Sequence, residues 1–260
     1  MILDELAAHA RERVAAARAR VPLEEIRARA EALPRGDFRF EKALTGKGTA
    51  FICEIKKASP SRGVIDPQFD YIGIAGQYEE AGADCISVLT EPKWFLGSDD
   101  IFRAVRLTVD APMLRKDFTV DAYQIYEARV LGADAVLLIC ALLDTGTLRE
   151  YLAICDRLGL SALVETHDEA EMQSAVAAGA RLIGVNNRNL KDFSVDLGNA
   201  ARLRAGAPEG TIFVAESGVS CPEDAAKLRQ AGADAILVGE YLMRSPDKQG
   251  ALQALREAVK

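Results

Sequence analysis

The segment Phe51-Ile-Cys-Glu-Ile-Lys-Lys-Ala-Ser-Pro-Ser-Arg-Gly63 begins as an apolar strand and ends as a polar loop. Glu54 and Lys56 are two residues apart, so both side chains lie on the same face of the predicted strand. Because an unpaired buried charge is costly, two charges on a face that would otherwise be core indicate a function. Parallel α/β folds place their chemistry at the carboxyl ends of strands. The segment therefore predicts a functional site where this strand ends.

Apolar runs of five to eight residues alternate with helical patterns from residue 50 onwards, which gives eight strand–helix units. The predicted strands cover residues 50–56, 84–89, 112–116, 134–140, 160–165, 182–186, 211–216 and 235–239. The predicted helices cover residues 71–82, 99–109, 121–131, 145–158, 168–179, 196–205, 222–231 and 249–259. This alternation indicates a parallel sheet whose strands are joined by helices.

An internal repeat underlies the alternation. Four Gly-Ala-Asp or Gly-Ala-Arg segments begin at Gly82, Gly132, Gly179 and Gly232, each at the end of a helix and the start of a strand. A glycine in that place is typical of the loops that lead from a helix into a strand. The glycines are 50, 47 and 53 residues apart, or two units each time. Such even spacing favours a closed α/β fold, the (β/α)8 TIM barrel of about 250 residues, over an open doubly wound sheet.

The first 45 residues differ from the rest of the chain. Apolar residues recur at helical spacing from Leu3 to Val14, and a second helix is predicted from Leu23 to about Leu33. No long linker rich in Pro and Ser follows them. We therefore expect residues 1–260 to form a single barrel domain, with residues 1–45 as an N-terminal helical extension that acts as a lid or as a packing surface.

The composition narrows the class of protein. The net charge of −7 and a pI near 5.1 argue against a nucleic-acid partner. The five cysteines form no Cys-x-x-Cys pair, which predicts free thiols in a reducing compartment. The longest wholly apolar run, residues 135–143, is too short to span a bilayer, and the start of the chain has no apolar signal core. These features predict a soluble, cytoplasmic protein with no membrane partner.

Polar residues recur at the predicted carboxyl ends of five strands, which meet at one mouth in a barrel. These residues are Glu54 and Lys56, Lys116, Glu165, Asn186 and Arg188, and Glu216 and Ser217. A ring of carboxylates and ammonium groups sets the conditions for general acid–base catalysis. We expect a lysine of this set, close to another cation and partly desolvated, to have a lowered pKa and to act as an acid. For any single residue, a solvated strand end or a structural ion pair is the alternative.

Glycine turns follow the last two predicted strands, at Gly218 and Gly239, with a short helix expected from about Glu240. Turns in this place are the usual phosphate site of a barrel. The long loop from Ala58 to Asp70 is predicted to gate the site. In the loop after the second predicted strand, the adjacent aromatic residues Trp94 and Phe95 suit a flat ring in the ligand, with packing between loops as the alternative.

Common catalytic motifs are absent from the sequence: it has no GxGxxG, Walker, GxSxG or HExxH segment. With two histidines in the chain, a His-based triad or a His-rich metal site is not expected. His167 precedes Asp168 and Glu169 at a predicted helix start and is interpreted as part of a helix cap. His9 is interpreted as a surface residue.

Five segments stand out as an ordered set: Cys53-Glu-Ile-Lys-Lys-Ala-Ser-Pro-Ser61, Leu114-Arg-Lys-Asp-Phe118, Leu163-Val-Glu165, Ile183-Gly-Val-Asn-Asn-Arg-Asn-Leu190 and Val214-Ala-Glu-Ser-Gly218. Together they resemble the indole-3-glycerol-phosphate synthase family over nearly the whole chain. The resemblance implies a lyase that closes the ring of 1-(2-carboxyphenylamino)-1-deoxyribulose 5-phosphate, releases CO₂ and water, and forms indole-3-glycerol phosphate for tryptophan synthesis. It implies no cofactor and no metal, a phosphorylated small-molecule substrate, and a monomer or homodimer.

The resemblance also implies residue roles. Lys116 is implied as the general acid that protonates the ketone oxygen, and Glu165 as the base or electrostatic partner of the dehydration. Lys56 is implied to meet the substrate carboxylate or to act as an acid; which lysine donates each proton stays open. The other implied roles are orientation of the lysines and sugar hydroxyls by Glu54, Asn186, Glu216 and Ser217, contact with the anthranilate side by Arg188, flanking of the ring by Phe95 and Phe118, and phosphate binding by Ser59, Gly218 and Gly239.

One position departs from the family pattern. Members of the family often have a small hydroxyl residue where this chain has Glu240, which we expect to point outward while backbone N–H groups bind the phosphate.

Three rival functions remain. They are an aldolase or lyase that forms a Schiff base on Lys116 or Lys56, an isomerase of a related phosphosugar amine, and a binding protein without activity. The isomerase would need an Asp/Cys acid–base pair, which is not found at matching strand ends.

Overall fold

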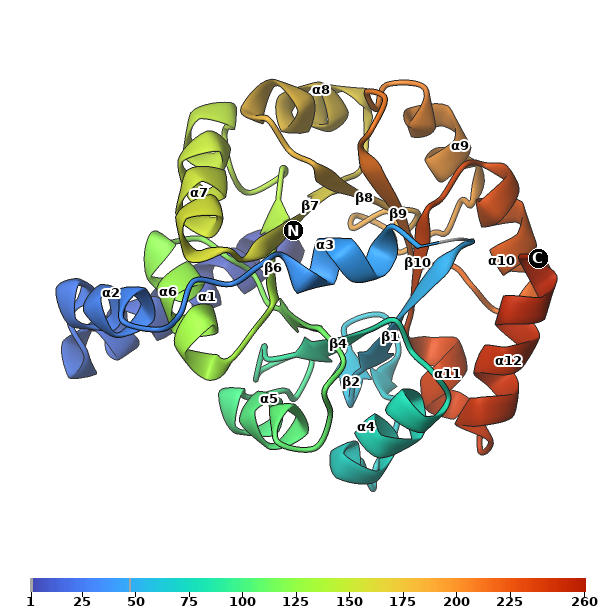
Figure 1. Ribbon diagram of the computed structural model, residues 1–260, viewed down its shortest axis with the longest axis horizontal. Coiled ribbons are helices and arrows are strands. Elements are labelled where there is room, and N and C mark those ends of the chain that lie inside the picture. The colour runs from blue at the N-terminus through green and yellow to red at the C-terminus, as the bar shows by residue number, and fades with distance from the viewer. Residues whose placement is uncertain (1, 47) are drawn as a thin grey trace.

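The computed structural model describes residues 2–46 and 48–260; Met1, the first residue of the predicted extension, and Lys47 lie outside the described residues. Eight parallel strands close into a barrel in the order β1-β10-β9-β8-β7-β6-β5-β4 (Figure 1). The predicted (β/α)8 barrel is therefore confirmed, and each predicted strand overlaps one strand of the barrel. The barrel strands are β1 (Ala50–Ile55), β4 (Cys85–Leu89), β5 (Met113–Lys116), β6 (Ala135–Ile139), β7 (Ser161–Thr166), β8 (Leu182–Asn186), β9 (Ile212–Glu216) and β10 (Ala235–Val238).

The helices follow the strands in alternation and surround them (Figure 1). Several start at an Asp or Ser whose side chain accepts a backbone N–H of the first turn, namely Asp70, Ser98, Asp121, Asp144, Asp168 and Asp247. The helices are α4 (Tyr71–Glu80), α5 (Asp99–Arg106), α6 (Ala122–Leu131), α7 (Thr145–Leu158), α8 (Glu169–Ala178), α9 (Gly198–Arg204), α10 (Pro222–Gln230), the short α11 (Glu240–Arg244) and α12 (Lys248–Ala258). None of the helices in residues 2–46 and 48–260 has the length and apolar character that a membrane crossing needs.

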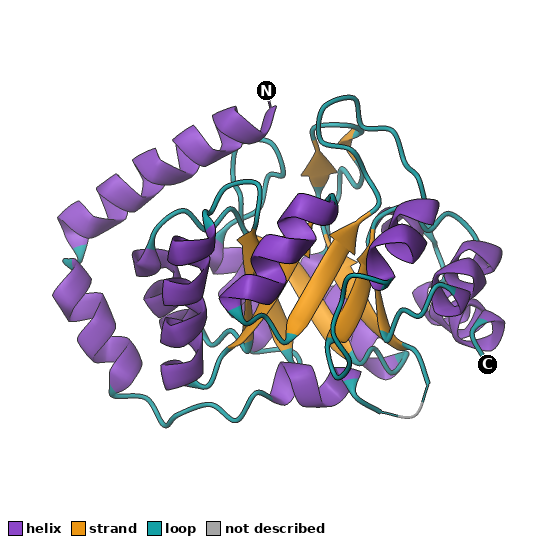
Figure 2. Cartoon of the chain, turned by 90° about the horizontal axis from the view of Figure 1, so that it is seen from above, coloured by secondary structure: helices purple, strands orange, loops and turns teal. Residues whose placement is uncertain are grey.

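The N-terminal extension forms helices α1 (Ile2–Arg20) and α2 (Leu23–Glu31) outside the barrel. Helix α2 packs against α6, whereas α1 runs along the end to which the strands point (Figure 2). Ion pairs fasten α1 to the loops there: Arg13 Nη2 is 2.7 Å from Asp117 Oδ2. Ile2, Leu3 and Leu6 line the main cavity. The extension therefore supplies part of the cavity wall at one end and packs on the barrel at the other.

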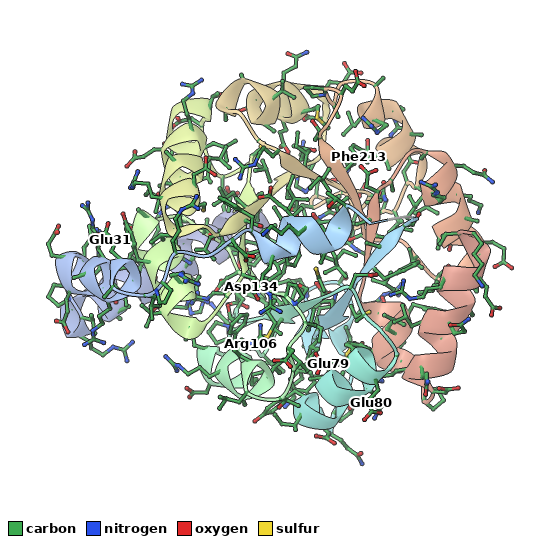
Figure 3. All side chains as sticks on the ribbon, viewed as in Figure 1. Glu31, Glu79, Glu80, Arg106, Asp134 and Phe213 are labelled. Atoms are coloured by element: carbon green, nitrogen blue, oxygen red, sulfur yellow. The ribbon has the colours of Figure 1, made fainter. Side chains whose placement is uncertain are left out.

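The repeated Gly-Ala-Asp segments have a shared role at the amino end of the barrel. Their glycines all adopt a left-handed backbone, with φ between +78° and +91°, which glycine adopts without strain. In three of the four segments the aspartate accepts a backbone N–H from the preceding barrel strand: Asp84 Oδ2 accepts from Phe51, Asp134 Oδ2 from Met113, and Asp234 Oδ2 from Phe213. Arg106 also donates to Asp134 (Figure 3). The repeat thus fixes the strand ends that face away from the predicted site.

The interior of the barrel is an apolar plug closed at the amino end by α3 (Arg39–Leu44), a helix that the sequence pattern did not predict. Figure 1 shows α3 lying across the barrel opening. Phe40 and Leu44 of α3 are fully buried against inward-facing residues such as Ile52, Leu114 and Leu163. A second unpredicted element is the antiparallel hairpin of β2 (Ala58–Ser59) and β3 (Gly63–Val64) in the loop after β1. Because α3 and the plug fill one end, the cavity opens at the carboxyl end.

Candidate active site

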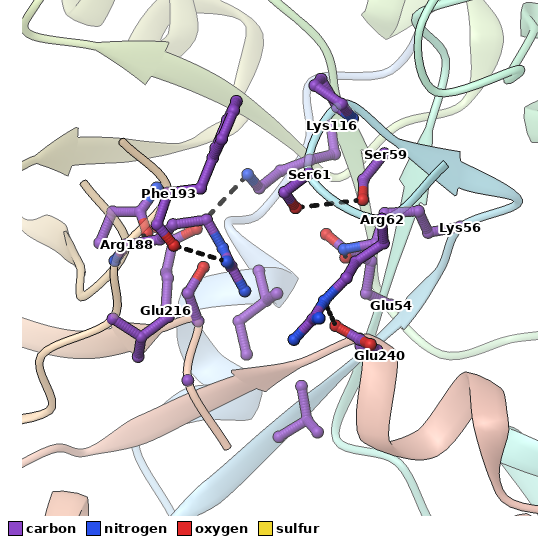
Figure 4. A pocket seen from close by; sticks show the side chains of 18 of the residues that line it. Glu54, Lys56, Ser59, Ser61, Arg62, Lys116, Arg188, Phe193, Glu216 and Glu240 are labelled. Atoms are coloured by element: carbon purple, nitrogen blue, oxygen red, sulfur yellow. Dashed lines mark hydrogen bonds and ion pairs between the residues drawn. The ribbon is translucent and has the colours of Figure 1, made fainter. Parts of the chain in front are cut away.

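Charged residues continue the interior apolar layer at the carboxyl ends of the strands. Leu114 and Leu163 belong to that layer, and Lys116 and Glu165 follow them two residues later. Because side chains alternate along a strand, both charged groups point into the mouth of the barrel. The mouth holds a cavity of about 860 Å³ (Figure 4). All the predicted site residues line it: Glu54, Lys56, Ser59, Phe95, Lys116, Phe118, Glu165, Asn186, Arg188, Glu216, Ser217, Gly218 and Gly239.

Lys116 lies between two carboxylates. Its Nζ is 3.4 Å from Glu165 Oε2 and 3.4 Å from Glu216 Oε2. Burial lowers the pKa of Lys116, but the carboxylates of Glu165 and Glu216 outweigh that effect and hold the pKa above its ordinary value. The expected lowering is therefore wrong for Lys116, because carboxylates rather than cations surround it. The ammonium group is charged at neutral pH and can stabilise negative charge that develops on a nearby oxygen.

The two carboxyl groups beside Lys116 have different proton affinities. Burial opposes ionisation of Glu165, but the Lys116 ammonium outweighs it and holds the pKa of Glu165 well below its usual range. Burial raises the pKa of Glu216 to about 7, because attraction to Lys116 offsets the lost hydration only in part. A Cβ at Gly184 would lie 2.1 Å from Glu216 Oε1, so a glycine makes room for this carboxyl. Carboxyl groups with separated pKa values are typical of acid–base sites.

A second ion pair lies on β1 and the residue that follows it. Lys56 Nζ is 2.5 Å from Glu54 Oε1, and the Glu54 side chain is 5% exposed. A Cβ at Gly239 would lie 2.4 Å from Glu54 Oε1 and 3.1 Å from Lys56 Nζ, so this pair needs glycine on the neighbouring strand end. The Glu54 carboxylate thus compensates the charge of Lys56 within the cavity wall.

Glycine turns close the cavity at the end predicted to bind phosphate. Ser217 and Gly218 have left-handed backbones, with φ of +66° and +96°. A Cβ at Gly218 would lie 2.7 Å from the side chains of Val195 and Leu197, so glycine is required there. Backbone N–H groups in tight turns of this kind bind anions. Ser59 also lines the cavity, in the loop after β1, the strand that neighbours β10, and its buried Oγ lies 3.4 Å from Ser61 Oγ.

Arginines gather at the same end. Arg62 Nε donates to Glu240 Oε2 over 3.1 Å, and Arg244 Nε donates to Glu240 Oε1 over 3.0 Å. Glu240 lines the cavity, so the expectation that it points outward is wrong. Burial lowers the pKa of Arg188, and the charge of Arg62 lowers it further, which indicates that the two guanidinium groups lie close together (Figure 4). Arg62 was not among the predicted site residues, although its place in the quoted segment after β1 was a usable signal.

Two phenylalanines form the other end of the cavity. The rings of Phe95 and Phe118 have centroids 5.9 Å apart and are tilted by 41°. The buried Glu91 holds the first of these loops, because its Oε2 accepts the backbone N–H groups of Trp94 and Phe95 at 2.7 and 3.1 Å. Trp94 packs edge-on against the ring of His9 and does not line the cavity. Of the two predicted aromatic residues, Phe95 alone is placed to contact a ligand.

His167 is a site neighbour that the sequence analysis missed. Its Nε2 lies 3.3 Å from Glu165 Oε1, and its Nδ1 lies 2.9 Å from Glu171 Oε2. Burial lowers the pKa of His167, but the nearby carboxylates of Glu165 and Glu171 outweigh it and raise the pKa to about 10. The interpretation as part of a helix cap overlooked the spacing from Glu165, because residues two apart on a strand share a face.

The comparisons with known proteins agree with this geometry. The family model described as "Indole-3-glycerol phosphate synthase" matches residues 3–255. An indole-3-glycerol phosphate synthase of Ruminiclostridium cellulolyticum is 55% identical over 98% of this chain and 99% of its own, and that of Lachnoclostridium phytofermentans is 46% identical over the full length of both chains. Among solved structures, a 3-hexulose-6-phosphate synthase has the same fold, with a TM-score of 0.64 and 19% identity over 82% of this chain and 100% of its own.

Proposed function

The chain belongs to the indole-3-glycerol phosphate synthase family, and we propose that the residues around Lys116 carry out its reaction in the cavity at the carboxyl ends of the strands. The enzyme is a lyase of tryptophan biosynthesis. It closes the ring of 1-(2-carboxyphenylamino)-1-deoxyribulose 5-phosphate, releases CO₂ and water, and forms indole-3-glycerol phosphate. The substrate is a phosphorylated small molecule that also carries an aromatic carboxylate.

In the proposed orientation the substrate lies across the mouth of the barrel. The phosphate binds at the turns of Gly218 and Gly239 and at Ser59, where the arginines reinforce the attraction of the backbone N–H groups for an anion. The aromatic ring lies at the opposite end, between Phe95 and Phe118. This orientation brings the ketone of the sugar chain over the charged cluster between the two ends.

Lys116 is the proposed acid of ring closure. As the ring carbon that bears the carboxylate attacks the ketone carbon, negative charge develops on the ketone oxygen. The Lys116 ammonium, charged because its carboxylate neighbours raise its pKa, neutralises that charge and donates a proton. Lys56 binds the carboxylate that leaves as CO₂, or donates the second proton of the reaction; this choice stays open. Loss of CO₂ restores the aromatic ring.

Glu165 is the proposed base of the dehydration. Its pKa is held well below the usual range, so it is ionised when the substrate binds. It takes a proton from the carbon next to the departing hydroxyl, while a lysine protonates that hydroxyl so that it leaves as water. Asn186, Glu54, Glu216 and Ser217 orient the lysines and the sugar hydroxyls. The resemblance implies that Arg188 contacts the anthranilate side, but its closeness to Arg62 favours the phosphate end instead.

The Schiff-base alternative requires a neutral lysine amine as nucleophile. The carboxylates that surround Lys116 oppose this, because they stabilise its protonated form. Borohydride added with substrate separates the two chemistries, since it traps a covalent adduct only if a Schiff base forms.

We further propose that residues 1–260 act as one domain, as a monomer or homodimer in the cytoplasm. The five cysteines are free. Burial raises the pKa of Cys53 and Cys155, which keeps those thiols unreactive and suits a reducing compartment.

The observation that carries the proposal is the Lys116 ammonium held between Glu165 and Glu216 beside the cavity. Product fluorescence tests it. Lys116→Ala is expected to lose on the order of 10²–10⁴ in kcat with folding intact by circular dichroism. Turnover close to that of the unsubstituted enzyme would remove the assignment of Lys116 as the acid.

A further inference from the structure

We propose that His167 and Glu171 form the path by which the proton consumed in each turnover passes from solvent to Glu165 and Lys116. The inference rests on the proposed function, because it concerns how Lys116 regains its proton after each turnover. These two residues are relay residues, which act through Glu165 and do not touch the substrate.

The reaction consumes one proton from solvent. The water that departs carries the former ketone oxygen with two protons, and both come from acid groups of the enzyme. The carbon next to the departing hydroxyl gives one proton to the base. The carboxylate leaves as CO₂ without a proton. The site therefore ends each turnover one proton short, and a proton from solvent must restore it.

The geometry provides a continuous chain away from the cavity. Glu165 uses its two oxygens on different partners: Oε2 lies 3.4 Å from Lys116 Nζ, and Oε1 lies 3.3 Å from His167 Nε2. His167 Nδ1 then lies 2.9 Å from Glu171 Oε2. Exposure of the side chains rises along the chain, from 4% for Glu165 to 16% for His167 and 20% for Glu171. A substrate in the cavity covers the Lys116 side of Glu165 but leaves Glu171 open to water.

The imidazole is held in place for this role. Glu171 Oε2 also accepts the backbone N–H of His167 at 2.8 Å, and Asn199 donates to the His167 carbonyl at 3.1 Å. Glu171 itself is fixed in the first turn of α8, where its N–H bonds Asp168. His167 Nε2 is buried and has no aligned hydrogen bond among the described residues, although Glu165 Oε1 is near. A small rotation of the ring aligns the two atoms.

The proton transfer is balanced. After Lys116 has protonated the substrate, the His167 N–H bond breaks, its proton passes through the Glu165 carboxyl group, and an N–H bond forms on the neutral Lys116 amine. The direction is downhill, because the pKa of His167 is raised to about 10 and that of Lys116 lies above its ordinary value. Glu171 then returns a proton from solvent to the imidazole.

The test is to compare the first turnover with the steady state in His167→Asn, by rapid mixing and product fluorescence. The first turnover can use protons already held by the acid groups of the site, Lys116 among them. We therefore expect a first turnover at the unsubstituted rate, followed by a steady-state rate lower by about 10-fold, a smaller loss than the 10²–10⁴ of direct proton transfer to substrate. Free imidazole in the buffer is expected to restore the steady state.

Two further variants complete the experiment. Glu171→Gln is expected to show the same split with a smaller loss, and it replaces His167→Asn if that variant does not fold. Glu169→Gln, an exposed carboxylate in the same turn of α8, is the matched control and is expected to leave both rates unchanged.

The outcomes separate the relay from the proposed function. An unchanged steady state in His167→Asn and Glu171→Gln overturns the relay, and so does an equal slowing of both phases that imidazole does not restore, which indicates a structural role. Neither result bears on the assignment of Lys116 as the acid of ring closure. Failure of the proposed function appears instead as a normal first turnover in Lys116→Ala.

Discussion

Arg115 and Lys116 follow one another on β5, and each places a cation among carboxylates on opposite sides of the barrel wall. On the outer side, Arg115 Nη2 is 2.8 Å from both Asp99 Oδ1 and Glu127 Oε2, and the side chain is 3% exposed. On the inner side, Lys116 Nζ is 3.4 Å from each of its two carboxylates, is 15% exposed, and lines the cavity.

The comparison shows that a buried cation among carboxylates does not by itself indicate a catalytic site. The outer cluster has short contacts and a planar guanidinium that binds carboxylates in a fixed geometry, as expected of a structural ion pair. The inner cluster has longer contacts, a lysine that can release a proton, and open space in front of it. Distance and access to a cavity separate the two, although the residue types are similar.

The largest expected difference between the two clusters is in catalysis. Glu165→Gln removes the carboxylate partner of Lys116 and is expected to lower kcat by on the order of 10²–10⁴. Glu127→Gln removes the matching partner of Arg115 and is expected to leave kcat within about 10-fold while lowering the free energy of unfolding by about 1–3 kcal/mol. Steady-state kinetics and urea unfolding of both variants check this. Similar kcat losses in both would erase the distinction between the clusters.

The second expected effect concerns the stability of the inner cluster. The pKa of Glu216 is raised to about 7, so the fold is more stable with this carboxyl neutral. The stability that this group contributes is complete below its unfolded pKa near 4.5 and is lost as the pH rises through 7. Glu216→Gln is therefore expected to unfold at higher urea concentration than the unsubstituted protein at pH 8, by about 2–3 kcal/mol, and to show little difference at pH 4.5. A less stable variant at pH 8 would show that Glu216 supports the fold as an anion.

A smaller effect is expected where the extension meets the outer cluster. The Asp117 carboxylate accepts from Arg13 at 2.7 Å and from Thr90 at 2.6 Å. Burial raises the pKa of Asp117, but Arg13 and Arg115 outweigh it and lower the pKa, so this stability is present above an unfolded pKa near 3.8 and lost as the pH falls below it. Arg13→Gln is expected to cost about 1–2 kcal/mol in urea unfolding at pH 7 and progressively less below pH 4. A loss that does not change with pH would exclude the Asp117 carboxylate as its source.

Much of the fold followed from periodicity and from the Gly-Ala-Asp repeat. The barrel, the strand positions and the charged strand ends could all be predicted, because strand–helix alternation and helix ends depend on residues that are close together in the sequence. Helix α3 was not, since it is short and begins after Phe38, a residue with a left-handed backbone and no capping side chain. The β2–β3 hairpin was missed because each strand has two residues.

The site residues were predictable as a set, but their electrostatics were not. The spacing of Glu54 and Lys56 places both on one strand face, but the approach of Lys116 to Glu165 and Glu216 joins three strands and depends on the closed barrel. The interaction of Arg62 with Glu240 joins residues 178 apart in the chain, so it depends on the closed barrel. His167 was assigned to a helix cap because the next residue, Asp168, does cap α8. That cap drew attention away from the two-residue spacing between His167 and Glu165.

The most direct test of the role of Lys116 compares substitutions at neighbouring residues of β5. Lys116→Met and Arg115→Met are assayed side by side for product formation, with each rate divided by the folded fraction from circular dichroism at the same temperature. Lys116→Met is expected to lose at least about 10²-fold per folded molecule, whereas folded Arg115→Met is expected to stay within about 10-fold and to be the less stable protein. Equal loss of activity per folded molecule in the two variants would contradict the assignment of Lys116 as the acid.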